Sequence, residues 1–188
     1  MINIRLFLIL FVTIFVQPTY TLANGILKTY LNEKAAYLCL PSKEVGLLAL
    51  LPEKESNLLT KSDVIAKLGK PDRVEGNSDF SKSYYGATKF VYGNDYVCSI
   101  STTSPSVHTP AGIHPGLDRQ ELFTIFGFKE AMKNFDAKSR KKSQKTYASS
   151  NKLSFMTCEG GFIGGGLIIT FDESGDKITK LYAGNDCP

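Results

Sequence analysis

Two segments of the chain repeat one pattern, and this repetition constrains the fold more than any other feature. The first segment is LTKSDVIAKLGKPD, residues 59–72, and the second is GLDRQELFTIFGF, residues 116–128. Aligning Gly69 with Gly127 places apolar residues at the same helical spacing in both segments. A polar residue stands at the start of each run and a glycine ends it, so the sequence predicts two short amphipathic helices of the same kind. In the second helix, the spacing of Asp118 and Glu121 predicts a capping box.

Each predicted helix is followed by three runs that are typical of antiparallel strands. The runs after the first helix are residues 82–85, 89–92 and 96–101, and those after the second are residues 152–157, 167–172 and 177–182. Residues 173–176 are expected to form a hairpin turn, and the Ser-, Thr- and Pro-rich residues 102–115 a linker. Residues 35–51 are apolar and are expected to supply an edge strand to the first sheet. The pattern predicts an α+β fold in which a helix and an antiparallel meander occur twice.

The N-terminus has the three regions of a cleavable signal peptide. Arg5 precedes an apolar run over residues 6–16, and small residues stand at Thr21 and Ala23. The apolar run is shorter than the roughly 20 residues that a membrane span needs. We therefore expect cleavage after Ala23, a periplasmic or secreted product, and no stable membrane insertion after cleavage. The expected organisation is a signal peptide at 1–23, a first helix-plus-sheet unit at 24–103 and a second at 104–188.

Four cysteines, all beyond the signal peptide, indicate disulfide bonds in an exported chain. They are Cys39, Cys98, Cys158 and Cys187. Of the three possible connectivities, the favoured one pairs Cys39 with Cys98 and Cys158 with Cys187, because each bond then stays within one half of the chain. Free thiols are the alternative, and a zinc site is disfavoured because no CxxC pair is present.

The charge of the chain is weakly basic, with 22 Lys and Arg against 18 Asp and Glu. This excess is too small to imply nucleic acid as a partner, for which a clustered basic face is expected. One basic cluster does occur, and it contains Lys138, Arg140, Lys141, Lys142 and Lys145. It is a candidate site for an acidic protein, lipopolysaccharide or a phosphate-rich polymer, with a solvated helix end as the alternative.

No constellation in the sequence predicts catalysis, a cofactor or a metal. His108 and His114 lie in the expected linker, and their spacing to Asp118 matches no closed set of metal ligands. A GxSxG nucleophile motif is absent. The glycine-rich residues 160–166 lead into a strand and not into a helix, so we interpret them as a hairpin tip and not as a phosphate loop. Phe162, at this tip, is a candidate partner contact.

Aromatic residues are frequent in the first predicted meander. They are Tyr84, Tyr85, Phe90, Tyr92 and Tyr96. Strand alternation sends some of them to the core and others to the opposite face, where tyrosine is a frequent interface anchor. Tyr85 and Tyr92 are the predicted contacts.

Three motifs together resemble a known family. They are Leu68-Gly69-Lys70-Pro71-Asp72, Tyr92-Gly93-Asn94 and Thr109-Pro110-Ala111-Gly112-Ile113. The set is similar to β-lactamase inhibitory protein and to the small outer-membrane assembly lipoproteins. The resemblance implies two tandem helix-plus-sheet repeats that bind another protein without catalysis. The chain departs from the pattern in the second copy, where the helix glycine is followed by Phe128 and no proline stands nearby, and in its widely spaced cysteines.

These expectations combine into one functional hypothesis. The chain is predicted to be an exported, non-catalytic protein-binding module of the inhibitor or immunity type, acting through its sheet faces. The alternatives are an assembly or scaffold factor of the cell envelope and, less favoured, a small envelope hydrolase. A hydrolase would need a nucleophile, a base and an oxyanion site in one place.

Overall fold

The computed structural model of the chain describes residues 25–31, 36–45, 59–158 and 166–184. Within these residues the fold is α+β, with nine strands in one sheet and five α-helices. The strand order is β1-β2-β7-β8-β9-β6-β5-β4-β3. The strands are β1 (Lys28–Leu31), β2 (Ala36–Leu40), β3 (Arg73–Gly76), β4 (Phe80–Tyr85), β5 (Thr88–Gly93), β6 (Tyr96–Thr102), β7 (Lys152–Thr157), β8 (Gly166–Phe171) and β9 (Ile178–Gly184).

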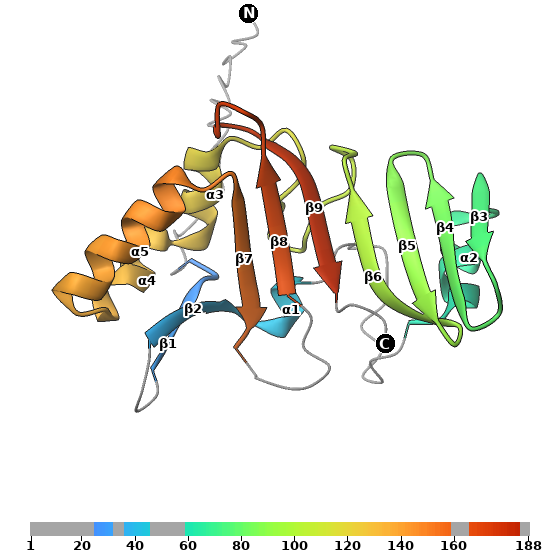
Figure 1. Cartoon of the computed structure of the whole chain (residues 1–188), viewed down its shortest axis with the longest axis horizontal. Coiled ribbons are helices and arrows are strands. Elements are labelled where there is room, and N and C mark those ends of the chain that lie inside the picture. The colour runs from blue at the N-terminus through green and yellow to red at the C-terminus, as the bar shows by residue number, and fades with distance from the viewer. Residues whose placement is uncertain (1–24, 32–35, 46–58, 159–165, 185–188) are drawn as a thin grey trace, which may run out of the picture.

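Most of the helices lie near the two ends of this sheet, and α1 lies near its middle, below β8 (Figure 1). They are α1 (Ser42–Val45), α2 (Lys61–Leu68), α3 (Arg119–Phe126), α4 (Phe128–Ala131) and α5 (Ala137–Ser149), with a 3-10 helix at Met132–Asn134. α2 lies at the end formed by β3 to β5, whereas α3, α4 and α5 lie at the end formed by β7. Among the residues that the structure describes, no helix has the length and apolar character needed to cross a membrane.

Both predicted helices form, but their caps differ from the expectation. Gly69 and Gly127 follow α2 and α3 with positive φ angles of 81° and 60°, which explains why glycine ends both runs. The capping box lies in α2, where the Thr60 hydroxyl accepts from the Asp63 backbone N–H and the Asp63 carboxylate accepts from Thr60 N–H. The prediction for Asp118 was wrong, because its side chain makes no cap hydrogen bond in α3.

All six predicted strand runs correspond to strands, namely β4 to β9. The sequence pattern missed β1 and β3, and it misplaced β2. β2 pairs in parallel with β7, through Cys39 with Met156 and Leu40 with Thr157, and not with the first meander. The hairpin of β1 and β2 therefore extends the sheet beyond β7.

The disulfide pairing predicted from the sequence was wrong. Cys39 of β2 is bonded to Cys158, which directly follows β7, with their Cα atoms 5.0 Å apart. The parallel contact of β2 with β7 brings these two cysteines together although 119 residues separate them. Cys98 is also disulfide-bonded, and Cys187 lies outside the described residues. Residues 1–23, the expected signal peptide, and Phe162 likewise lie outside them.

Candidate functional site

One face of the sheet forms the core and the other is turned away from it, as the strand register shows. A row of paired residues crosses the sheet on the core side and is buried: Ser83, Phe90, Ile100, Ala183, Leu167 and Phe155. The rings of Phe126 in α3 and Tyr147 in α5 pack on Phe155, so helices cover this side. Side chains alternate along a strand, so the next row faces the other way.

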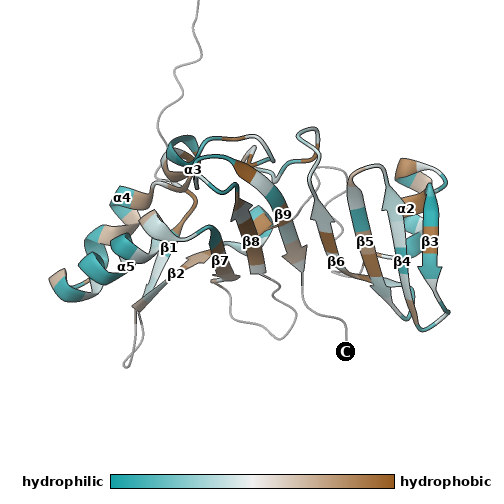
Figure 2. Cartoon of the chain, turned by 45° about the horizontal axis from the view of Figure 1, so that its top comes forward, coloured by the Kyte–Doolittle hydropathy of each residue, from teal (hydrophilic) through white to brown (hydrophobic). Residues whose placement is uncertain are grey.

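That second row defines the outer face of the sheet. Its paired residues are Arg73, Tyr84, Lys89, Ser101, Tyr182, Ile168 and Ser154. Most of them are half-buried or exposed, although Ser101 is covered by its neighbours. Ile168 and Tyr182 give the middle of the face an apolar and aromatic character, in keeping with the hydrophobic colouring of β8 (Figure 2).

An exposed aromatic cluster occupies the β1–β2–β7 end of the outer face. Tyr30 and Tyr37 are cross-strand partners, and their rings stack with centroids 4.9 Å apart. Met156 faces the same way, because it pairs with Cys39, and its exposed fraction is 67%. The exposed fractions of Tyr30 and Tyr37 are 41% and 36%. We call Tyr30, Tyr37 and Met156 the tyrosine–methionine cluster.

The opposite end of the outer face holds a second group of ordered side chains. The Arg73 guanidinium lies 4.0 Å from the centre of the Tyr84 ring and 3.3 Å from the Glu75 carboxylate. The Tyr84 hydroxyl donates to the same carboxylate at 2.8 Å, and this hydrogen bond raises the pKa of Tyr84. These contacts hold an arginine and a tyrosine, two residue types enriched at binding hot spots, in fixed orientations.

The outer face is also basic. Glu75 is the only acidic residue of the described strands, and it is paired with Arg73. The other charged side chains of the face are Lys28, Lys82, Lys89, Lys152 and Lys180. The face therefore suits a partner whose surface carries negative charge.

The tyrosines predicted as contacts lie on the core side. Tyr92 is only 1% exposed, so it cannot contact a partner, and burial raises its pKa to about 12. Side chains alternate between the two sides of β5. Val91 pairs with Lys82 and faces outward, so the adjacent Tyr92 faces the core. Tyr85 is half-buried, donates to the Gly69 carbonyl at 3.3 Å and packs edge-on against Phe90.

The predicted basic cluster lies on α5, at the β7 end of the molecule. Lys138, Lys141 and Lys142 are exposed. Arg140 differs, because its guanidinium donates to the carbonyls of Lys133 and Phe135 and holds the start of the helix. Arg140 is therefore a structural residue, whereas the three lysines are available to a partner.

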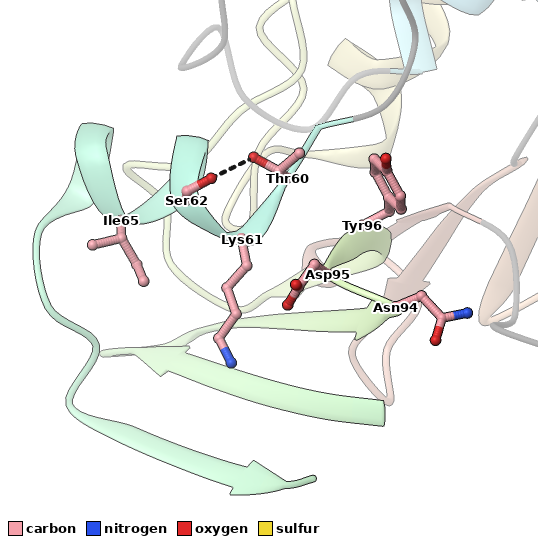
Figure 3. Close-up of a pocket in the computed structure, with 7 residues that line it drawn as sticks. All are labelled: Thr60, Lys61, Ser62, Ile65, Asn94, Asp95 and Tyr96. Atoms are coloured by element: carbon pink, nitrogen blue, oxygen red, sulfur yellow. Dashed lines mark hydrogen bonds between the residues drawn. The ribbon is translucent and has the colours of Figure 1, made fainter. Parts of the chain in front are cut away.

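A pocket of about 490 Å³ lies where the start of α2 meets the turn between β5 and β6 (Figure 3). Its lining residues are Thr60, Lys61, Ser62, Ile65, Asn94, Asp95 and Tyr96. The Lys61 ammonium donates to the Ser81 hydroxyl at 3.3 Å, and the Lys61 backbone N–H donates to the Asp95 carbonyl. These polar groups serve the local fold, and they do not form a nucleophile and base pair.

The two histidines are far from this pocket in the chain and are tied to their own loop. Nδ1 of His108 lies 2.8 Å from the Thr109 carbonyl, and Nδ1 of His114 lies 2.8 Å from the Pro115 carbonyl. The described residues contain no group of three or more His, Cys, Asp or Glu side chains that could hold a metal ion.

Sequence reasoning missed the tyrosine–methionine cluster, although a signal for it exists. In KLSFMT of β7, polar and apolar residues alternate, which places Met156 with Lys152 and Ser154 on the outer side. The same alternation separates Tyr37 from Leu38 in β2. The parallel pairing of β2 with β7, which joins these residues into one cluster, has no local signature.

Comparison with protein families and with curated proteins finds no match for this chain. Among solved structures, the chain is similar to an extracellular protein containing a SCP domain from Bacillus anthracis str. Ames. The identity is 11% and the TM-score 0.44, over 84% of this chain and 50% of the other. The chain thus spans about half the length of the protein that it matches.

Proposed function

We propose that the protein is an exported, non-catalytic protein-binding module of the inhibitor or immunity type, which contacts its partner through the outer face of the sheet. The observation that carries this proposal is the tyrosine–methionine cluster on a face that packs no core. Rigid aromatic side chains and methionine are enriched in protein interfaces, where they supply large contact areas. An outer face that served only as a solvated surface would have little use for them.

The cluster is organised before a partner arrives. Tyr30 and Tyr37 restrain each other by stacking, and β2 is fixed to the next strand by the Cys39–Cys158 disulfide. Side chains that are already ordered lose less entropy on binding, so more of their contact energy becomes affinity. The lysines around the cluster would add steering toward an acidic surface.

The order of elements supports a two-unit architecture for this module. We infer that α2 with β3 to β6 is one helix-plus-sheet unit and that α3 to α5 with β7 to β9 is the second, joined edge to edge by the β6–β9 pairing. A continuous sheet made from two such units gives one long outer face. The motif resemblance to β-lactamase inhibitory protein is in keeping with this arrangement.

The test is a binding assay with outer-face variants. The mature chain is used to capture a partner from an extract of the source cells and their medium, and the purified partner is then titrated. Truncation of Tyr37 or Met156 to Ala is expected to cost about 2 kcal/mol or more if it is an anchor. The matched control truncates Ile65 and Val74, which are 41% and 52% exposed and lie outside the outer-face rows.

Two further variants separate binding from catalysis. Replacing His108 and His114 by Ala is expected to leave the affinity unchanged, because neither imidazole is needed as base or ligand. Equal affinities for wild type and the Tyr37→Ala, Met156→Ala double variant would contradict the outer-face proposal. Turnover of an envelope substrate that disappears in the double-histidine variant would instead favour the hydrolase.

A further inference from the structure

Four lysines of α5 lie along one side of the helix. With 3.6 residues per turn, Lys138, Lys141, Lys142 and Lys145 fall within an arc of roughly 100°, and Tyr147 points to the opposite side. All four lysines are exposed, whereas Tyr147 packs on the core. We call these four residues the lysine ridge. The hydrophilic character of α5 is visible in Figure 2, where it contrasts with the neighbouring strands.

The lysine ridge weakens the helix that carries it. Its members are spaced three and four residues apart, where like charges repel, and the helix contains no acidic residue. Lys138 also stands in the first turn, where the helix dipole disfavours a positive charge. Asp136 accepts from the backbone N–H groups of Lys138 and Ser139 and attracts the charge of Lys138, whereas Glu130 pairs with Lys133, outside the ridge. Within the described part of the chain, no ion pair includes a ridge lysine.

Other residues hold α5 in place. The Arg140 guanidinium donates to the Phe135 carbonyl before the helix, and Arg119 donates to the carbonyls of Tyr147 and Ser150 at its end. The Tyr147 ring adds the apolar contact. The ridge lysines are therefore not needed for the position of the helix, and their repulsion is tolerated for another reason.

The composition of the ridge indicates the kind of partner. Lysine is depleted in protein interfaces, where aromatic residues and arginine are enriched, and the exposed side of α5 presents neither. Clusters of lysine on a helix instead attract anionic bilayer surfaces, to which each lysine contributes independently. The remaining exposed side chains, such as Gln144 and Thr146, are polar and give no means of insertion. We propose that α5 is a docking helix that adsorbs to anionic phospholipid headgroups without entering the bilayer.

The test measures binding of the mature chain to vesicles. Vesicles of phosphatidylcholine mixed with phosphatidylglycerol are compared with vesicles of phosphatidylcholine alone, by co-sedimentation at low and high salt. Replacing the four ridge lysines by Gln is expected to lower the partition coefficient for the anionic vesicles by roughly 600-fold, at about fivefold for each lysine. High salt is expected to abolish binding of the wild type, because it shortens the Debye length to about 3 Å.

A control with the same net charge distinguishes the ridge from a general charge effect. Lys43, Lys67, Lys70 and Lys177 are exposed and lie outside α5, so their replacement by Gln is expected to change binding by less than the ridge variant does. Circular dichroism establishes that both variants keep their helices. Equal losses in the two variants, or equal binding of wild type to neutral and anionic vesicles, would overturn the proposal. Salt-sensitive binding to an acidic protein without binding to anionic vesicles would also overturn it.

The proposal for lipid binding by α5 and the proposal for protein binding by the outer face can be refuted independently. The ridge variant is expected to keep its affinity for the protein partner, since the ridge lies on a helix and not on the outer face. Conversely, the Tyr37→Ala variant is expected to keep its affinity for anionic vesicles.

Discussion

Arg119 joins three parts of the second half of the chain, and its replacement gives a sharp test of the fold. Its guanidinium donates to the carbonyls of Tyr147 and Ser150, each at 2.6 Å, and its Nε donates to the Gly175 carbonyl. The guanidinium also stacks 3.8 Å from the centre of the Phe171 ring. α3, the end of α5 and the turn before β9 thus meet at one side chain. Burial is the main influence on Arg119, and it lowers the pKa of the guanidinium.

The size of the effect follows from these contacts. A hydrogen bond to a charged group contributes about 1.5 to 3 kcal/mol, but the side chain is only partly buried and the carbonyls regain water when it is removed. We therefore expect Arg119→Met to lower the free energy of unfolding by about 3 to 4 kcal/mol. Arg119→Lys should lose about 2 kcal/mol, because a compact ammonium cannot reproduce the planar fork or the ring stacking.

Urea denaturation with linear extrapolation measures these changes. The control is Arg73→Met, which also removes an arginine from a tyrosine ring and from an ion pair. Arg73 lies at the exposed edge strand, where its side chain is 61% exposed, so the loss should stay below about 1 kcal/mol. The reasoning is refuted if Arg119→Met costs no more than Arg73→Met, or if lysine restores full stability at position 119.

Further predictions concern processing, disulfides and pH. N-terminal sequencing of exported material should begin at or near Asn24, and a product that retains Met1 would contradict cleavage. Peptide mapping without reduction should link Cys39 to Cys158 and, by elimination, Cys98 to Cys187; a free thiol would contradict this. Replacing Cys39 and Cys158 by Ser should lower the free energy of unfolding by up to roughly 5 kcal/mol, because the bond closes a long loop. The pKa of tyrosine is near 10 in the unfolded chain, whereas the pKa of Tyr92 in the folded chain is about 12. Between these pH values Tyr92 loses its proton only in the unfolded state, so the free energy of unfolding should fall as the pH rises. Tyr92→Phe should make this fall smaller, by on the order of 1 kcal/mol, in denaturation curves recorded across that range, while tyrosines with smaller upward pKa shifts, such as Tyr147, keep the remainder.

The sequence allowed α2, α3 and the strands β4 to β9 to be predicted because their signals are local, whereas β1, β3 and α5 were missed. The helical spacing before Gly69 and Gly127 and the alternation in residues 82–101 and 152–182 depend only on neighbours along the chain. The place of β2 depends on a parallel contact with β7, which is distant in the sequence. The predicted disulfides failed for the same reason, since they assumed that each half closes on itself.

The candidate site was harder to predict than the fold, because it depends on which face of each strand is covered. The aromatic residues of β4 and β5 are suited to either face, and only the register shows that Tyr84 faces outward while Tyr92 is buried. Basic character was easier to find, because charges seldom enter a core. The sequence alone, however, does not distinguish the structural role of Arg140 from that of the neighbouring lysines. That role is shown by its hydrogen bonds to two backbone carbonyls.

The position of the β1–β2 hairpin explains why Tyr30, Tyr37 and Met156 lie together. β1 and β2 lie near the start of the described residues, and Met156 comes from the second half of the chain, so none of them forms a contact surface alone. The parallel pairing places Tyr37 and Met156 on one face, and the disulfide beside them joins the same two segments covalently. A cluster built from distant segments keeps its geometry only while those segments stay together. The disulfide therefore stabilises the fold and the proposed contact surface at the same point, because it links the two segments that carry Tyr37 and Met156.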